Sequence, residues 1–199
     1  MIYFDNAAST AVHPEVVKEM MPYFDVQYGN PSSIHQFGRK AKNAIQKARK
    51  QVAALIGAEP NEIIFTSGGT ESNNTVLMGI TSSRPEQNHV ITSSIEHEAI
   101  LQPCKQYEKI GYKITYIPVD EHGIVDSDEI SSSINSHTII VSIMFANNEV
   151  GTIQPIKEIS KICKKYQIPL HTDAVQAVGK VPINVKELGV DALSISSHK

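Results

Sequence analysis

Short runs rich in β-branched residues alternate with helix-like segments along the chain, and this alternation constrains the fold more than any other feature. Six such runs are predicted to be strands, and they span residues 62–67, 89–95, 113–119, 138–146, 168–174 and 192–197. Strands interleaved with helices indicate a mostly parallel sheet that helices cover on both faces. The sequence therefore predicts an α/β fold, built as a three-layer sandwich.

The longest helical pattern begins near Ser33, after Pro31, and ends at Gly57. Its small and apolar residues form one stripe at helical spacing: Phe37, Ala41, Ala44, Ala48 and Val52. The preceding segment, residues 1–32, is rich in Pro, Asn and Gly, and we expect it to run over the surface. Residues 33–199 contain no repeat, low-complexity stretch or linker, and are predicted to form one layered domain.

Composition excludes several classes of function. The 199 residues are 41% hydrophobic with a formal net charge of −3, which fits a soluble globular protein with a substantial core. The lysines are scattered over polar helix faces, so no nucleic-acid surface is predicted. No apolar run approaches membrane-spanning length. The N-terminus lacks the features of a secretory signal, and a cytoplasmic location is the expectation.

Both cysteines are predicted to be core residues. Cys163 lies at helical spacing with Ile159, Ile162 and Tyr166, and Cys104 follows Ile100 by four residues on another helical stretch. Burial without a cationic neighbour raises the pKa of a thiol, so neither is expected to be reactive. A disulfide between them is not expected in a reducing cytosol.

In parallel sheets, ligands bind at the carboxyl ends of the strands. After the run 62–67 comes "SGGT", with Gly69 and Thr70 at the start of a helix. Glycines allow close approach of an anion, and the free amides of a helix start favour a phosphate. A plain tight turn with Thr70 as helix cap is an equally good interpretation. The loop lacks the lysine of a nucleotide-binding loop, so ATP is not indicated.

The residues that follow the other strands are polar or ionisable: His97, Asn147 and Asn148, Asp173 and Gln176, and finally Ser196, His198 and Lys199. His97 and Glu98 begin like a zinc-protease helix, but Leu101 stands where the second histidine should be, so no metal site is predicted. Each group alone could be a cap or a turn. Together, a phosphate-compatible loop, a histidine, an amide, a carboxylate and an amine match pyridoxal 5′-phosphate. Its aldehyde forms a Schiff base with a lysine, and its pyridinium nitrogen pairs with a carboxylate.

Seven motifs then carry a resemblance to a known family: "FDNAAST", "NPSSIHQFGRKA", "FTSGGTESNN", "EHEAI", "ANNEVGTIQP", "HTDAVQAVGK" and "SSHK". In this order they resemble the cysteine desulfurases of the class V aminotransferase superfamily, from Tyr3 to Lys199. The resemblance implies the large cofactor domain of a fold type I pyridoxal-phosphate enzyme.

The resemblance also implies roles for individual residues. Lys199 would form the Schiff base and remove the substrate Cα proton, and His97 would stack on the ring and assist proton transfer. Asp173 would pair with the pyridinium nitrogen and Gln176 with the phenolic oxygen, while Asn148 would lie near that oxygen and the substrate carboxylate. The phosphate would be held by the loop at Gly69 and by three side chains, those of Thr70, Ser196 and His198.

The resemblance implies conversion of L-cysteine to L-alanine, with sulfur passed as a persulfide to iron–sulfur cluster assembly or tRNA thiolation. It further implies a homodimer and sulfur-acceptor or scaffold proteins as partners. A selenocysteine lyase, a related class V aminotransferase, and a non-catalytic fragment that serves as a binding or dimerisation module are the alternatives.

Two departures from the family stand out. Family members are about twice as long, so the loop with the nucleophilic cysteine, the carboxylate-binding arginine and the small domain would all follow Lys199. Neither Cys104 nor Cys163 matches the nucleophile. A polypeptide that ended at Lys199 would therefore release no alanine from cysteine unless the C-terminal half were supplied in trans. The second departure is Ser197, where many relatives have glycine; its side chain would crowd the approach to the phosphate.

Overall fold

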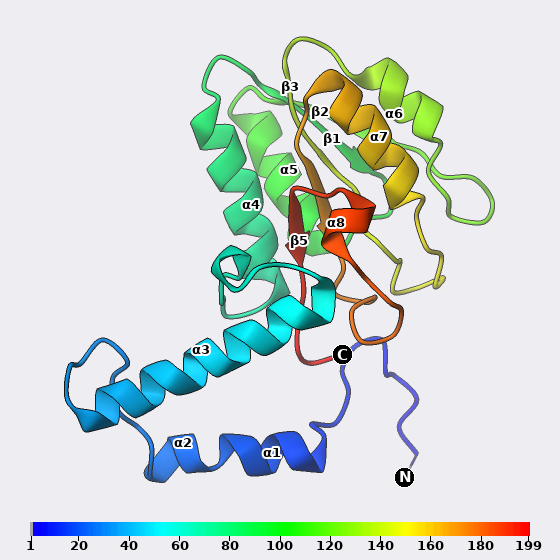
Figure 1. The fold of residues 1–199 in the computed structure, drawn as a ribbon. Helices are drawn as coiled ribbons and strands as arrows, with labels where there is room; N and C mark the ends of the chain where they lie inside the picture. Colours follow the sequence, from blue (N-terminus) through cyan, green and yellow to red (C-terminus); the bar gives the residue numbers. More distant parts are fainter. Residues whose placement is uncertain (1) are drawn as a thin grey trace. The chain divides into compact units, whose positions relative to one another are not determined.

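A computed structural model describes residues 2–199 and contains, within them, one parallel five-stranded sheet (Figure 1). The strands lie in the order β2-β1-β3-β4-β5. Their bounds are His89–Ser93 for β1, Lys113–Ile117 for β2, Thr138–Ser142 for β3, Leu170–Asp173 for β4 and Ala192–Ser194 for β5. All four neighbouring pairs are parallel, so the carboxyl ends of the five strands share one edge. Five of the six predicted strands are thereby confirmed.

Helices cover both faces of the sheet, as Figure 1 shows. On one face lie α4 (Gly69–Ser83) and α5 (Glu98–Lys109), where Leu77 and Ile100 pack against strand residues such as Ile140. The other face is covered by α6 (Ser127–Ser133) and α7 (Ile156–Tyr166), with Ile159 packed in the larger apolar cluster. Each fully buried Leu or Ile contributes ~1.5–3 kcal/mol of transfer free energy. The predicted three-layer α/β sandwich is confirmed.

The prediction of a strand at residues 62–67 is wrong. A short 3₁₀-helix, η1 (Pro60–Glu62), covers the start of this run, and residues 63–66 have no regular structure. Ile64 is 76% exposed and Phe65 is 49% exposed. A β-branched run becomes a strand only when a neighbour pairs with its backbone, and no described residue supplies that pairing here.

The N-terminal region is more helical than its composition indicated. Two short helices, α1 (Pro14–Met20) and α2 (Pro22–Asp25), each begin with a proline and have no buried residue. Proline at the first helical position was the signal that sequence reasoning missed. The long helix α3 (Gln36–Ile56) is confirmed, with Gly57 in the left-handed conformation at φ 71° as its cap. No helix of residues 2–199 is both long enough and apolar enough to cross a membrane.

The chain divides into two compact units. The first comprises the described residues up to Ile64 together with His198 and Lys199. The second is Phe65–Ser197. The helices of the first unit are α1, α2, α3 and η1, and the second holds the sheet with α4 to α8, the last of which is Val185–Leu188. The predicted boundary after residue 32 lies inside the first unit. The assignment of residues 33–199 as a cofactor domain remains a prediction.

Both cysteines are core residues, as predicted. Cys104 packs on the face covered by α4 and α5, whereas Cys163 packs in the cluster on the opposite face. Burial raises the pKa of each thiol to about 12. Both thiols are therefore protonated and shielded at neutral pH.

Candidate functional site

Asp173 is the last residue of β4 and the most deeply buried of the predicted site residues, with 6% of its surface exposed. Its Oδ2 accepts a hydrogen bond from Asn73 Nδ2 at 2.7 Å, and its Oδ1 accepts one from the Val175 backbone N–H at 3.0 Å. Both donors are uncharged, and Asp173 forms no ion pair within residues 2–199. The carboxyl group is thus fixed in orientation while its charge is left available to a cationic ligand.

The loop before α4 packs directly against the turn that follows Asp173. A Cβ placed on Gly69 would lie 2.9 Å from Val175 Cγ2 and 4.0 Å from Ser196 Cβ. Only glycine permits this approach, because real Cβ atoms do not come within 3.0 Å of such a neighbour. The structure therefore brings Gly69, Ser196 and the end of β4 together, as the strand order predicts.

Gly68, and not Thr70, is the N-cap of α4, so the cap interpretation of Thr70 is wrong. Thr70 is the second residue of the helix, and its side chain is exposed in the first turn. Gly68 has no side chain with which to cap the first-turn amides, and this leaves the helix start suited to an anion. Glu71 instead accepts a hydrogen bond from the Ser67 N–H, which lowers the pKa of the Glu71 carboxyl and orders the loop.

The turn after β1 places His97 at the start of α5. Its Nδ1 accepts a hydrogen bond from the Ala99 backbone N–H at 3.1 Å, which makes His97 the N-cap of the helix. With Nδ1 occupied as an acceptor, the neutral ring carries its proton on Nε2. The exposed imidazole is therefore held by one edge, while the other nitrogen is available to a ligand.

Glu96, next to His97, is a buried acid that sequence reasoning missed. It is 5% exposed, and its Oε1 accepts hydrogen bonds from Ser93 Oγ at 2.6 Å and from the Met144 N–H at 2.7 Å. Its Oε2 is buried and has no partner among the described residues. Burial, with a further contribution from the charge of Asp173, raises the pKa of Glu96 to about 8. At neutral pH this side chain is mostly the neutral acid.

The two neighbouring amides after β3 have different tasks. Asn147 is buried: its Nδ2 donates to the Ile95 carbonyl at 3.0 Å, and its Oδ1 accepts from the Glu149 N–H at 2.8 Å. Asn148 is half-buried and donates from Nδ2 to Glu149 Oε1 at 2.7 Å. Asn147 thus builds the turn, whereas Asn148, the predicted ligand, is presented by it.

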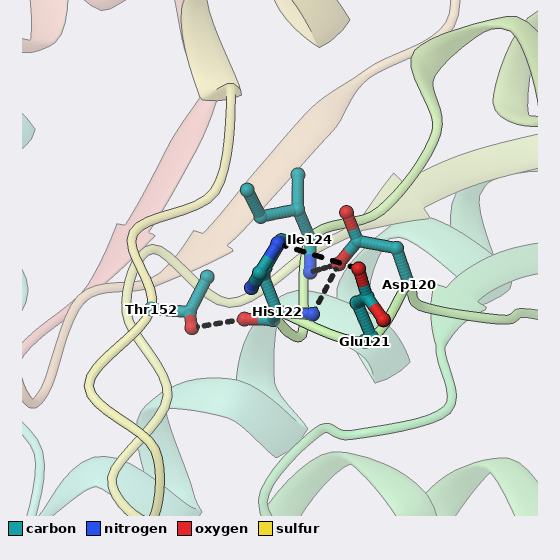
Figure 2. A network of polar contacts seen from close by, with 5 residues as sticks. All are labelled: Asp120, Glu121, His122, Ile124 and Thr152. Carbon is teal, nitrogen blue, oxygen red and sulfur yellow. Dashed lines mark hydrogen bonds and ion pairs between the residues drawn. The ribbon is translucent and has the colours of Figure 1, made fainter.

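The loop of residues 120–124 forms a network of polar contacts that reaches Thr152 (Figure 2). Asp120 Oδ1 accepts hydrogen bonds from the backbone N–H groups of His122 at 2.9 Å and Ile124 at 2.8 Å. Thr152 Oγ1 then donates to the His122 carbonyl. Since Ala146 and Ile153 pair in an isolated bridge, the Thr152 hydrogen bond connects the Asp120 loop to the hairpin that carries Asn148.

His171 forms the centre of a buried polar chain that sequence reasoning also missed. Its Nδ1 lies 2.9 Å from Ser142 Oγ, and its Nε2 lies 3.0 Å from Ser194 Oγ. The Ser194 hydroxyl in turn lies 2.8 Å from Ser72 Oγ. Burial lowers the pKa of His171 to about 4, although the charge of Asp173 acts in the opposite direction. A neutral imidazole thus links β3, β4 and β5 to the first turn of α4.

The remaining predicted residues lie as follows. Gln176 is half-buried, and its Oε1 accepts a hydrogen bond from Lys180 Nζ at 3.0 Å. His198 and Lys199 belong to the first unit, where the His198 carbonyl accepts hydrogen bonds from the Thr10 N–H at 3.1 Å and Thr10 Oγ1 at 3.2 Å. Within residues 2–199, no group of three or more His, Cys, Asp or Glu side chains is placed to hold a metal ion.

Curated relatives match the whole chain. It is 54% identical over 199 residues to the cysteine desulfurase IscS of Dictyoglomus turgidum and 55% identical to that of Methanosarcina thermophila. These alignments cover 100% of this chain but only 50% and 49% of the two relatives. The chain therefore spans about half the length of the curated relatives that it matches.

Solved structures share the fold. A structure described as SspA in complex with cysteine superposes with a TM-score of 0.97 at 41% identity, over 100% of this chain and 57% of the other. The apo structure of a cysteine desulfurase from Thermococcus onnurineus gives a TM-score of 0.91 at 32% identity, over 100% of this chain and 50% of the other. The family model described as aminotransferase class-V matches residues 2–199. The chain belongs to the class-V aminotransferase family.

Proposed function

We propose that this protein is a pyridoxal-phosphate-dependent cysteine desulfurase, which converts L-cysteine to L-alanine and transfers the sulfur as a persulfide. Members of the class-V family use this cofactor, and the relatives at 54% and 55% identity are named cysteine desulfurases. The observation that carries the proposal is the buried Asp173 carboxylate, which lies at the sheet edge beside a glycine-dependent loop at the uncapped start of α4.

The residues of the second unit fit the cofactor. Asp173 offers an oriented carboxylate without a cationic partner in the described chain, which suits a protonated ring nitrogen. The amides of Gly69 and Thr70 and the hydroxyl of Ser196 supply donors for a phosphate. Gln176 and Asn148 supply amides for the phenolic oxygen and the substrate carboxylate.

The bound cofactor supplies an electron sink for the negative charge that develops when the substrate Cα proton leaves. Asp173 favours the protonated ring nitrogen and so strengthens this effect. His97, held by its Nδ1, presents Nε2 to the site and can hold or move a proton there. Lys199 follows Ser196 by three positions, and we assign its amine both the covalent attachment of the cofactor and the removal of the Cα proton.

The thiol that accepts sulfur is neither Cys104 nor Cys163. Both are buried, and burial raises the pKa of each to about 12, so neither supplies a thiolate at neutral pH. Selenocysteine lyase and other class-V transamination remain the alternative activities. Alanine release from cysteine, compared with selenocysteine at equal concentration, distinguishes them.

The test uses the complete polypeptide with bound cofactor. Borohydride reduction should give a protein–pyridoxyl adduct in the wild type and in Lys165→Ala, which changes an exposed lysine on α7, but none in Lys199→Ala. The wild type should release alanine from L-cysteine over many turnovers. An adduct in Lys199→Ala would refute the lysine assignment, and an absence of alanine with the adduct present would refute the proposed reaction.

We further propose a cytoplasmic homodimer that passes sulfur to acceptor or scaffold proteins in iron–sulfur cluster assembly or tRNA thiolation, without direct nucleic-acid or membrane binding. The name IscS of the relatives and the net charge of −3 support this. Sedimentation at working concentration tests the homodimer, and cluster formation on a scaffold protein tests the sulfur transfer.

A further inference from the structure

We propose that Glu96 is a positioning residue of the cofactor site, which locks the turn that carries His97 to the turn that carries Asn148. The inference rests on the function proposed above and assigns a task to a residue next to the predicted ligands. Glu96 lies between β1 and α5, on the loop from which His97 begins its helix.

The geometry consists of two cross-links between the loops. In the first, Glu96 Oε1 accepts from Ser93 Oγ, at the end of β1, at 2.6 Å and from the Met144 N–H, in the loop after β3, at 2.7 Å. In the second, Asn147 Nδ2 donates to the Ile95 carbonyl at 3.0 Å, so both donors lie on the loop after β3 and both acceptors on the loop after β1. Two neighbouring hydrogen bonds thus join the loops, of which the one to Glu96 is buried, and the joined pair presents His97 and Asn148.

The charge state of Glu96 follows from its surroundings. Oε1 accepts both hydrogen bonds, so the acid proton belongs on Oε2, which is buried without a partner among the described residues. The titratable groups that act on Glu96 from neighbouring elements are Asp173 at the end of β4 and Cys104 on α5. Cys104 is protonated at neutral pH, so Asp173 is the charge that opposes ionisation of Glu96.

Two consequences separate this role from simple packing. Glutamine at position 96 keeps an acceptor at the place of Oε1 but cannot ionise, so it should replace Glu96 at neutral pH. Above a pH of about 8 the buried carboxyl group of wild-type Glu96 ionises. Its negative charge then adds to that of Asp173, and the repulsion weakens the contact between the two loops. The wild type should lose order there, and the glutamine variant should not.

The experiment measures the dissociation constant of pyridoxal phosphate from the complete apo polypeptide between pH 7 and 9. At pH 7 we expect Glu96→Ala to bind ~10–100-fold more weakly than the wild type, as is usual when a supporting partner of a ligand is removed, and Glu96→Gln to bind within ~3-fold. From pH 7 to 9 the ratio of the wild-type to the Glu96→Gln dissociation constant should rise. Glu98→Ala, an exposed neighbour on α5, is the control and should match the wild type.

A second readout needs no cofactor. Hydrogen exchange of the Met144 amide in the apo protein should be slow in the wild type and in Glu96→Gln, and faster in Glu96→Ala, because Glu96 is its acceptor. If Glu96→Ala does not fold, Glu96→Asp, which is shorter by one methylene, takes its place. Unchanged affinity and unchanged exchange in the alanine variant, or a glutamine variant as weak as alanine, would overturn the inference. Failure of the wild type to bind the cofactor would instead overturn the proposed function, and this inference with it.

Discussion

Replacing Glu96 with glutamine should flatten the dependence of the free energy of unfolding on pH between pH 6.5 and 8. The folded state holds the pKa of this carboxyl at about 8, against an ordinary value of 4.5 in the unfolded chain. Between these values the unfolded chain has lost the proton and the folded protein keeps it. The stability associated with Glu96 is therefore complete below pH 4.5 and falls as the pH rises towards 8.

The magnitude follows from the linkage relation. Each pH unit within the window costs about 1.4 kcal/mol, so the full difference between the two pKa values corresponds to about 5 kcal/mol. The contribution of Glu96 to the unfolding free energy is measured most cleanly above pH 6.5. Below that pH the contribution of His171 also changes, and it changes with pH in the opposite direction. Burial lowers the pKa of His171 from 6.5 to about 4, so its contribution is complete above pH 6.5 and falls with pH below that value. Between pH 6.5 and 8 the Glu96 contribution is about 2 kcal/mol.

The assay is denaturant unfolding of the complete apo protein at half-unit steps from pH 6.5 to 8, followed by circular dichroism. The difference in unfolding free energy between the wild type and Glu96→Gln should change by about 2 kcal/mol across this range, in favour of the variant at the higher pH. Glu98→Gln, a matched substitution on the exposed side of the same helix start, should give a constant difference. A constant difference for Glu96→Gln as well would refute the assignment of a buried neutral acid.

Three further predictions concern neighbouring groups. Replacing His171 with asparagine should reduce the loss of unfolding free energy between pH 6.5 and 4, measured by denaturant unfolding over that range, because the variant has no imidazole to protonate at this buried position. Gly69→Ala should weaken pyridoxal-phosphate binding in a direct titration, because the new Cβ would lie 2.9 Å from Val175 Cγ2 and push the loop outward; Val175→Ala in the same protein should recover part of that loss. Asp173→Ala should slow substrate deprotonation in single-turnover measurements by ~10²-fold or more, because it removes a preorganised charge from the ring nitrogen; an unchanged rate would remove Asp173 from this role.

The sheet could be predicted because it depends on local patterns, and the same patterns place the candidate site at one sheet edge. The buried strands are short β-branched runs such as Thr138–Ser142, and parallel strands bring their carboxyl ends to one edge wherever the connections lead. Asp173 and Ser196 could thus be assigned to one edge before any coordinates were known. The run 62–67 is likewise rich in β-branched residues, but pairing depends on a neighbour that the pattern does not specify, and so the strand prediction failed there.

The residues that support the candidate site could not be predicted, because their role depends on burial. In the sequence Glu96 is one acid in "IEHEAI", with Glu98 two positions away, and no local pattern distinguishes the two. The fold buries the first against Met144, where it is a neutral acid, and leaves the second exposed on the surface. His171 likewise reads as a strand histidine until the hydroxyls of Ser142 and Ser194 close on both ring nitrogens. The positions of the candidate ligands along the chain can be read from the sequence, whereas the protonation states of these supporting groups arise only when the layers pack together.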